Sequence, residues 1–508
     1  MSGQAPRHRA ARTGLTIAAA TTSALIVISL FAASVVLRPF SGIVDDTAGF
    51  GSQSSQQVSQ LQLSSYCPAR MSLADTGEFG DSQFRISSGN IASSARYAAF
   101  GSVYQSSVGS LAATGDTTSL VSDGQSDVLT TSGDVDQAAT VLRTRLLESK
   151  SGTGTASSVA SWATTGDLKG ISAASCVGMS LSHQFLLSGT ATGTTQQLVI
   201  ANPSSKATAV QVEAWGTSGA GKLTLSTGES VTVRANGETT IDLSAAVPGQ
   251  NGLYVSVSSR QSPIAAVVRT VSMDGLTSHG SEYVTPLADA SATSVMPSVT
   301  EGDHVDLIAF GRTDSAVRLS WVTSKGLVSV SDERLTAGTV AVIDAGRAPK
   351  DAMALVAVAD KAIYASARIV RNGENGQEDF AMENASAAYE SSAVAIPDGF
   401  EDEATFVNVG SADAKAVVKA YDSHGTLIGQ EELALDANTA KRLDIMQTFP
   451  DAVAVRVDRS SGELHWGVSL SRNALDDASL AGVAYLPSTP LDELRETIRV
   501  DQDPSIVR

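Results

Sequence analysis

The chain has 508 residues, of which 42% are hydrophobic but only 5% aromatic, and its formal net charge is −18 at pH 7. This length allows roughly three to five domains of ordinary size. The acidic balance argues against a nucleic-acid-binding protein, because such proteins carry basic faces. Abundant Ser, Thr, Gly and Ala are typical of short strands joined by tight turns rather than of long amphipathic helices.

A basic segment followed by a long apolar run opens the chain. Residues 1–14 contain Arg7, Arg9 and Arg12, whereas residues 15–37 carry no charge. A helix of that length spans roughly 34 Å, enough for a bilayer core of ~30 Å. A cleaved signal peptide is the alternative, although its apolar region is normally only ~7–15 residues long. We therefore predict an uncleaved single-pass anchor in the plasma membrane, with the N-terminus in the cytoplasm and the bulk of the chain extracellular.

Two Ser-rich regions follow the predicted anchor. Residues 38–66 are rich in Ser, Gln and Gly, which predicts a flexible spacer. Residues 67–180 contain short apolar runs, which predicts a β-rich region, but the segment 136–148 fits a helix or a strand. Cys67 and Cys176 are the two cysteines of the chain. An even count outside the cytoplasm favours one disulfide between them, with two buried free thiols as the alternative.

From about residue 180 the chain repeats itself with a period near 100 residues. The segments 212–219, 319–326 and 418–425 share an aliphatic residue near the start and a Gly near or at the end. Two further landmarks recur at nearly constant separation: Asp242, Asp344 and Asp444, and then Pro248, Pro349 and Pro450. Such a period is too long for a solenoid and indicates tandem domains.

Each repeat contains about six or seven short alternating segments with turn signals between them, the pattern of an immunoglobulin-like β-sandwich. We predict an all-β chain with three tandem immunoglobulin-like sandwiches and a polar C-terminal tail. The predicted bounds are 181–285, 286–386 and 387–490 for the sandwiches and 491–508 for the tail.

The stretch from Gly216 to Lys222 carries seven of the eight positions of a phosphate-binding loop. Such a loop needs Ser or Thr after the Lys and a helix that points at the phosphates. Leu223 follows the Lys instead and begins an alternating strand pattern. We therefore predict a hairpin turn and no nucleotide.

No catalytic, cofactor-binding or metal-binding constellation is predicted. A G-x-S-x-G motif is absent from the sequence, and the histidines lack the spacing of metal ligands or of a catalytic triad. The acidic segment 115–136 lacks the ligand order of a calcium loop. The recurring Asp242, Asp344 and Asp444 are expected to cap local turns by accepting hydrogen bonds from backbone N–H groups.

Aromatic side chains are the candidates for ligand contact. Trp321 shares its strand parity with Val317, so we expect it in a core. Trp215 and Tyr421 share parity with polar residues and are expected on an outer face, and Trp466 is treated in the same way. An outward ring stacks on sugars or seals a neighbouring domain. Domain sealing is the favoured interpretation, and sugar contact is the alternative.

The sequence combines three features: the N-terminal anchor, YCPAR at 66–70 and the segment 175–219 (SCVGMSLSHQFLLSGTATGTTQQLVIANPSSKATAVQVEAWGTSG). Together they resemble an uncharacterised actinobacterial family, known only as a domain of unknown function. Its members look like membrane-anchored, secreted-side proteins with a Cys-Pro segment after the anchor and a second Cys before the first repeat. The resemblance covers most of residues 60–490, but Asn202-Pro203 is not retained in the later repeats. It implies a cell-surface location and carries over no catalytic residues.

These observations predict a non-enzymatic, membrane-anchored, extracytoplasmic protein of the cell envelope with a structural or protein-interaction role. A glycan-binding or adhesive surface protein is the alternative, and an envelope enzyme within residues 67–180 is a further one. The expected partners are the membrane, through the N-terminal helix, and an envelope glycan or protein. No nucleic acid or cofactor is expected.

Overall fold

The computed structural model describes residues 54–73, 87–113, 115–122, 124, 126–275, 277–493 and 495–500. The chain forms two compact units, one from residues 1–59 and 495–508 and the other from residues 60–494. In the first unit, β1 (Ser54–Ser59) pairs antiparallel with β36 (Arg495–Val500). The larger unit contains the other strands, and all its ladders are antiparallel.

Repeat 1 of the larger unit consists of two sheets built in a fixed pairing order. The first strand pairs with the sixth, the sixth with the third and the third with the fourth; in the other sheet the fifth pairs with the second, the second with the seventh and the seventh with the eighth. In chain order the strands are β11 (Ser182–Ser188), β12 (Thr194–Asn202), β13 (Thr208–Gly216), β14 (Lys222–Leu223), β15 (Ser230–Val233), β16 (Gly237–Asp242), β17 (Gly252–Ser259), β18 (Ala265–Asp274) and β19 (Thr277–Val284). The two short strands β14 and β15 together take the fourth place in the order.

Repeats 2 and 3 follow the same order. Repeat 2 contains β20 (Ser291–Met296), β21 (His304–Phe310), β22 (Ser315–Thr323), β23 (Gly326–Leu335), β24 (Val340–Arg347), β25 (Ala352–Asn372), which supplies both the sixth and seventh places, and β26 (Glu378–Asn384). Repeat 3 contains β27 (Ser391–Ala395), β28 (Glu401–Asn408), β29 (Ala414–Tyr421), β30 (Leu427–Leu435), β31 (Thr439–Asp444), β32 (Ala454–Ser461), β33 (His465–Ser471), β34 (Ala484–Pro487) and the extra strand β35 (Thr489–Pro490).

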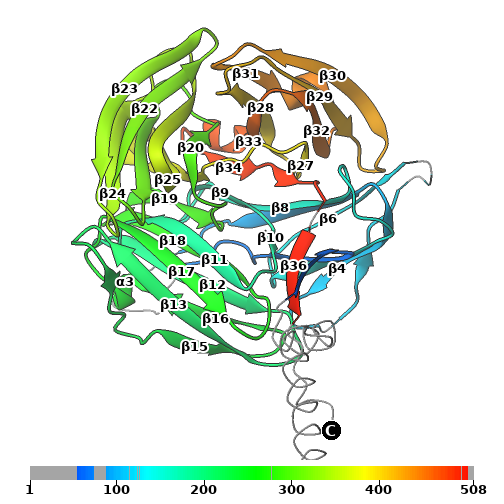
Figure 1. The fold of residues 1–508 in the computed structure, drawn as a ribbon, viewed down its shortest axis with the longest axis horizontal. Helices are drawn as coiled ribbons and strands as arrows, with labels where there is room; N and C mark the ends of the chain where they lie inside the picture. Colours follow the sequence, from blue (N-terminus) through cyan, green and yellow to red (C-terminus); the bar gives the residue numbers. More distant parts are fainter. Residues whose placement is uncertain are drawn as a thin grey trace, which may run out of the picture. The chain divides into compact units, whose positions relative to one another are not determined.

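The N-terminal region is a further copy of this arrangement, which the sequence did not reveal. Its strands β2 to β9 pair in the same order, and β10 returns to β2 as β35 returns to β27. They are β2 (Gln62–Cys67), β3 (Ala92–Phe100), β4 (Val103–Ser110), β5 (Thr118–Ser119), β6 (Val128–Gly133), β7 (Thr140–Leu146), β8 (Gly154–Ala163), β9 (Gly170–Ser175) and β10 (Val177–Gly178). In the described part of the chain the order thus occurs four times, and Figure 1 shows these strand groups from blue to red.

This order differs from that of immunoglobulin domains. In those domains the first strand lies beside the second, whereas here it lies beside the sixth. The prediction of an all-β chain is confirmed, whereas the three predicted sandwiches do not have the immunoglobulin strand order. Alternating sequences such as that of β13 explain the sheets, because its buried residues Thr208, Val210, Val212 and Ala214 occupy every second position.

Hydrophobic cores form between the sheets of each repeat. In repeat 1 one cluster includes Leu186 and Val255 from one sheet and Leu198 and Val268 from the other. Trp321 is 4% exposed in the core of repeat 2, as its parity predicts. These apolar contacts supply the burial that stabilises each repeat.

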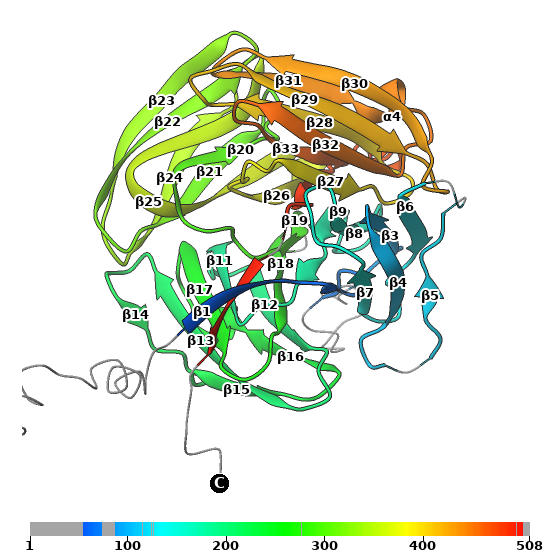
Figure 2. The same cartoon turned by 45° about the vertical axis from the view of Figure 1, so that its right-hand side comes forward.

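The eighth strands of the repeats, β9, β19, β26 and β34, contact one another in the interior of the larger unit. Figure 1 labels β9, β19 and β34 close together, and Figure 2 labels β9, β19 and β26 close together. Each is the edge of its sheet, so its outer N–H groups need partners. Buried carboxylates provide them. Asp379 Oδ2 accepts from the N–H groups of Ile171 (2.9 Å) and Val483 (3.0 Å), and Glu282 Oε1 accepts from the N–H of Ala173 (2.9 Å). Acidic side chains thus link backbones of different repeats.

Several predicted segments have a different structure or lie outside the described residues. Residues 136–148, which fitted a helix or a strand, contain β7. The predicted spacer at 38–66 includes β1 and part of β2, because its polar residues join ladders, and the predicted polar tail contains β36. The predicted anchor at 15–37 lies outside the described residues, among which no helix is long and apolar enough to cross a membrane.

Candidate functional site

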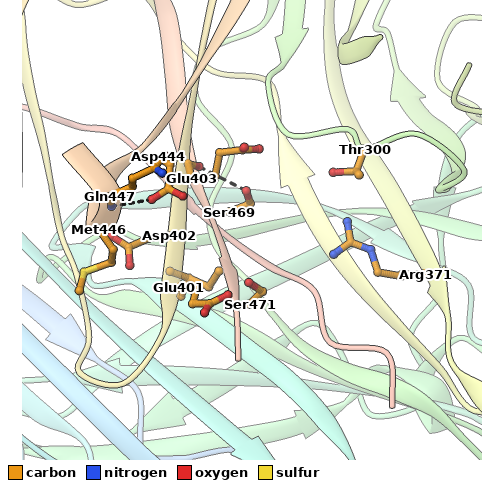
Figure 3. A pocket seen from close by; sticks show the side chains of 11 residues that line it. Thr300, Arg371, Glu401, Asp402, Glu403, Asp444, Met446, Gln447, Ser469 and Ser471 are labelled. Carbon is orange, nitrogen blue, oxygen red and sulfur yellow. Dashed lines mark hydrogen bonds between the residues drawn. The ribbon is translucent and has the colours of Figure 1, made fainter. Parts of the chain in front are cut away.

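A cleft between repeats 2 and 3 gathers acidic and hydroxyl side chains (Figure 3). Its volume is about 410 Å³. Thr300 and Arg371 come from repeat 2, and the other lining residues come from repeat 3. The repeat 3 residues are Glu401, Asp402, Glu403, Asp444, Met446, Gln447, Ser469, Leu470 and Ser471. This concentration of carboxylates at a repeat junction makes the cleft the candidate binding site.

The strand register of repeat 3 explains why these groups meet. Glu403 of β28 lies opposite Asp444 of β31 on one side and Ser469 of β33 on the other, and Glu401 lies opposite Ser471. Alternation along β28 leaves Glu401 exposed and Glu403 half-buried. Outward residues of three neighbouring strands therefore line one wall.

The cleft carries net negative charge because four acidic residues and one cationic residue, Arg371, line it. Arg371 forms a bidentate ion pair with Asp303, at 3.0 Å from each oxygen. Arg442 contacts Glu403 Oε1 at 3.2 Å. Glu401 and Asp444 form no salt bridge with any residue that the structure describes. The cleft consequently suits a cationic group better than an anionic one.

Asp402 differs from its neighbours on β28. It is 3% exposed, and neither of its carboxylate oxygens has a hydrogen-bond partner among the described residues. Figure 3 shows it pointing to the other side of the strand from Glu401 and Glu403. Burial raises the pKa of Asp402 to about 7, and the charges of Asp444 and Glu401 add to the effect. Asp402 is therefore a buried acid that ionises near neutral pH.

Repeat 2 brings together a second group that the sequence reasoning missed. The Nε2 atom of His304 lies 3.6 Å from Asp306 Oδ1 and 3.4 Å from Asp344 Oδ1. These potential ligand atoms all lie within 4.8 Å of one another. His304 and Asp306 are two residues apart on β21, a spacing that puts both on one face of a strand. Only the pairing of β21 with β24 adds Asp344.

A smaller cavity of about 190 Å³ lies between repeats 1 and 2 and includes Asp306 and Arg368 in its lining. The guanidinium of Arg368 lies over the ring of Phe380 at 4.9 Å and 3.9 Å from Asp306 Oδ2. Burial lowers the pKa of Arg368, and the charges of Asp306 and Glu378 oppose that shift.

The predicted disulfide is present between Cys67 and Cys176. Cys67 is fully buried at the end of β2, and Cys176 lies between β9 and β10. The bond therefore joins the two sheets of the N-terminal repeat.

The aromatic residues proposed as ligand-facing pack against protein instead. Tyr421 is 8% exposed and meets Phe100 of the N-terminal repeat edge to face at 5.9 Å. Trp466 is 2% exposed, and its Nε1–H donates to Ser392 Oγ. Trp215 is half-buried against Phe310 of repeat 2. Strand parity identifies the face of a sheet on which a side chain lies but not whether another repeat covers that face. Tyr421 and Trp215 seal contacts between repeats, which is the favoured interpretation, whereas Trp466 is a core residue.

The remaining motifs are structural. Gly216 ends β13, and Lys222 and Leu223 form β14, which pairs back onto β13, so the loop is the predicted hairpin turn. Asp242 and Asp444 cap α3 (Leu243–Ala246) and α4 (Ile445–Thr448), as predicted. Asp344 instead lies within β24, where its Oδ1 accepts from the N–H of Gly346 at 2.7 Å.

The model of a family of unknown function, DUF5719, matches residues 130–446. The chain belongs to this family. The family's description states no activity, so membership adds no chemistry to the two sites. No curated protein matches the chain.

Two solved structures are similar to parts of the chain. Dimeric latent PorU from Porphyromonas gingivalis is 9% identical with a TM-score of 0.12, covering 68% of this chain and 31% of that one. Streptomyces avermitilis α-L-rhamnosidase complexed with L-rhamnose is 11% identical with a TM-score of 0.11, covering 72% and 54%. The chain spans less than two thirds of either, and such TM-scores bear on neither fold nor function.

Proposed function

We propose that this member of DUF5719 is a non-enzymatic, membrane-anchored protein of an actinobacterial cell envelope with a structural or protein-interaction role. The observation that carries the proposal is the buried Cys67–Cys176 disulfide, because disulfides persist mainly in oxidising, extracytoplasmic compartments. The predicted anchor at residues 15–37 would hold the rest of the chain outside the membrane.

Each two-sheet repeat would serve as a platform for binding surfaces, as β-sandwich domains of varied strand order do. The buried carboxylates of Asp379 and Glu282 support a rigid platform, since they join backbones of different repeats. The acidic cleft between repeats 2 and 3 supports the interaction role. Its partner would be an envelope protein that presents Lys or Arg side chains to Glu401 and Asp444.

Thiol labelling and protease treatment of intact cells test the location. The proposal expects an intact disulfide on the isolated chain and cleavage of the large unit by added protease without cell lysis. Two alkylatable thiols, or complete protection from protease, would contradict it.

Crosslinking in the same cells tests the interaction. Glu401→Gln should weaken a crosslink to the partner protein, since it removes an exposed charge from the cleft. Glu431→Gln is the matched control, because Glu431 is exposed on β30 outside the cleft. Equal crosslinking by both variants would remove the cleft from the proposal.

Glycan binding is the second candidate, and a different cavity favours it. A cavity of about 630 Å³ beside the disulfide is lined by hydroxyl, amide and proline side chains, including Ser157, Gln62 and Pro263. Ser157 is 5% exposed, and its Oγ has no hydrogen-bond partner among the described residues. Hydroxyl-rich surroundings of this kind suit sugar hydroxyls.

Retention of the purified full chain on isolated cell-wall polysaccharide tests this candidate. Arg143 lines the cavity, whereas Arg145, two residues along β7, stacks over Tyr104. Loss of retention in Arg143→Ala but not in Arg145→Ala, with competition by free oligosaccharide, would favour glycan binding. Absence of retention in the wild type would leave the protein-interaction role.

A further inference from the structure

The cluster of His304, Asp306 and Asp344 lies on two paired strands of one sheet. Asp306 and Asp344 are register partners across the β21–β24 ladder, and His304 precedes Asp306 by two residues. Three donors on adjacent strands have little backbone freedom, so their spacing is set by the sheet.

The spacing fits the coordination sphere of a metal ion. Bonds of about 2.0–2.2 Å to nitrogen and oxygen ligands place neighbouring ligand atoms roughly 3.0–3.6 Å apart. The distances from His304 Nε2 to the Oδ1 atoms of Asp344 and Asp306 are 3.4 and 3.6 Å. An ion can therefore lie among these three atoms with little rearrangement of the side chains.

The repeats differ in the backbone that follows this Asp. Asp242, Asp344 and Asp444 each accept a backbone N–H at Oδ1, but in repeats 1 and 3 that N–H belongs to a helical turn. In repeat 2, β24 runs on through Asp344 to Arg347, and the carboxylate turns towards His304. Its bond from the N–H of Gly346 orients the carboxylate, as outer-shell bonds do in metal sites.

Arg368 contacts one carboxylate oxygen of Asp306 and leaves the other available to a metal ion. Its guanidinium approaches Oδ2 of Asp306, at 3.9 Å, while Oδ1 faces His304. The cluster is open to solvent, since the side chains of His304 and Asp344 are 36% and 68% exposed. Water can therefore complete the coordination.

We propose that His304, Asp306 and Asp344 bind one divalent transition-metal ion, with Zn²⁺ as the probe, in addition to the function proposed above. Imidazole nitrogen favours such ions over Ca²⁺ and Mg²⁺, which prefer all-oxygen sites. Three protein ligands with open positions correspond to the ligand number of catalytic rather than structural zinc sites.

Calorimetric titration of the purified full chain with Zn²⁺, after removal of metal with a chelator, tests the proposal. One ion should bind per chain, and His304→Ala and Asp344→Asn should each weaken that binding at least about tenfold. Asp476→Asn, at an exposed residue of repeat 3 outside both sites, and His279→Ala, which removes the separate His279–Glu378 pair, should leave it unchanged.

Titration with Co²⁺ supplies a second readout that misfolding would not imitate. The visible absorption of bound Co²⁺ should appear in the wild type and in Asp476→Asn and be lost in His304→Ala. Melting temperatures of the metal-free proteins show whether each variant is folded. The exposed Asp344→Asn serves if His304→Ala does not fold. Absence of binding by the wild type, or equal binding by all four variants, would overturn the proposal.

Discussion

Repeats 1 and 3 share a strand register, so their buried positions can be compared one by one. Asn202 ends β12 and Asn408 ends β28, and each donates from Nδ2 to the carbonyl four residues on. Six residues earlier stand Gln196 and Asp402, which therefore occupy the same place. Both are buried, at 0% and 3% exposure.

The two side chains differ in their partners. Gln196 Nε2 donates to the carbonyl oxygen of Ser188 at 2.9 Å, and its Oε1 accepts from Thr270 Oγ1 at 2.6 Å. Asp402 has Leu470 as its cross-strand neighbour where Gln196 has Thr270, and both its oxygens lack partners among the described residues. The fold thus accepts either residue at this position. Hydrogen bonds offset the desolvation cost of the buried glutamine, but none offsets that of the buried aspartate among the described residues. This difference makes repeat 3 the pH-sensitive one at this position.

Gln196→Asp should produce the largest effect, because it transfers the uncompensated acid to repeat 1. The variant loses the donors to Ser188 and places a carboxylate against carbonyl oxygens. We expect the free energy of unfolding to fall by about 3–5 kcal/mol near pH 8. Denaturant unfolding measures it, with Gln197→Asp on the same strand as the control; equal losses in both variants would contradict the comparison.

Asp402→Asn should have the opposite sign and depend on pH. A carboxyl whose pKa rises from 3.8 to about 7 on folding holds its proton longer in the folded state, so stability falls as pH rises from about 4 to about 7. The full shift corresponds to roughly 4 kcal/mol, so the variant should gain about 1–4 kcal/mol near pH 8 and much less near pH 4.

Urea unfolding at both pH values measures the gain from Asp402→Asn. Asp476→Asn, an exposed residue of the same repeat, is the control and should change stability at neither pH. A gain that is equal at both pH values would show that ionisation of Asp402 is not its cause.

The capping residues should give the smallest differences. Asp242→Ala and Asp444→Ala remove helix caps and should each cost about 0.5–2 kcal/mol in the free energy of unfolding. Asp344→Ala should cost less, because no helical turn depends on it. Thermal unfolding in metal-free buffer ranks the three variants, and a larger loss for Asp344→Ala would show that its side chain supports β24.

Sequence reasoning identified features that depend on local chemistry. The hairpin at Gly216–Lys222 followed from the missing Ser or Thr and the strand pattern after it, and the caps Asp242 and Asp444 from their position before a turn. It failed for the N-terminal repeat, which has no Pro between its fifth and sixth strands, β6 and β7, although its strands pair in the same order. Pairing order depends on backbone hydrogen bonds, which many sequences with the right alternation can form.

The sequence by itself determined the β-rich class, the repeat period and the availability of exactly two cysteines for one bond, because strand alternation, turn residues and residue counts are local properties. Tertiary structure decided which outward faces are covered, as for Tyr421 against Phe100. It also decided which distant polar groups meet, as for His304 with Asp344 and for Asp379 with the backbones of β9 and the segment preceding β34. Those contacts arise from packing between strands far apart in the chain, and no single-strand pattern encodes them.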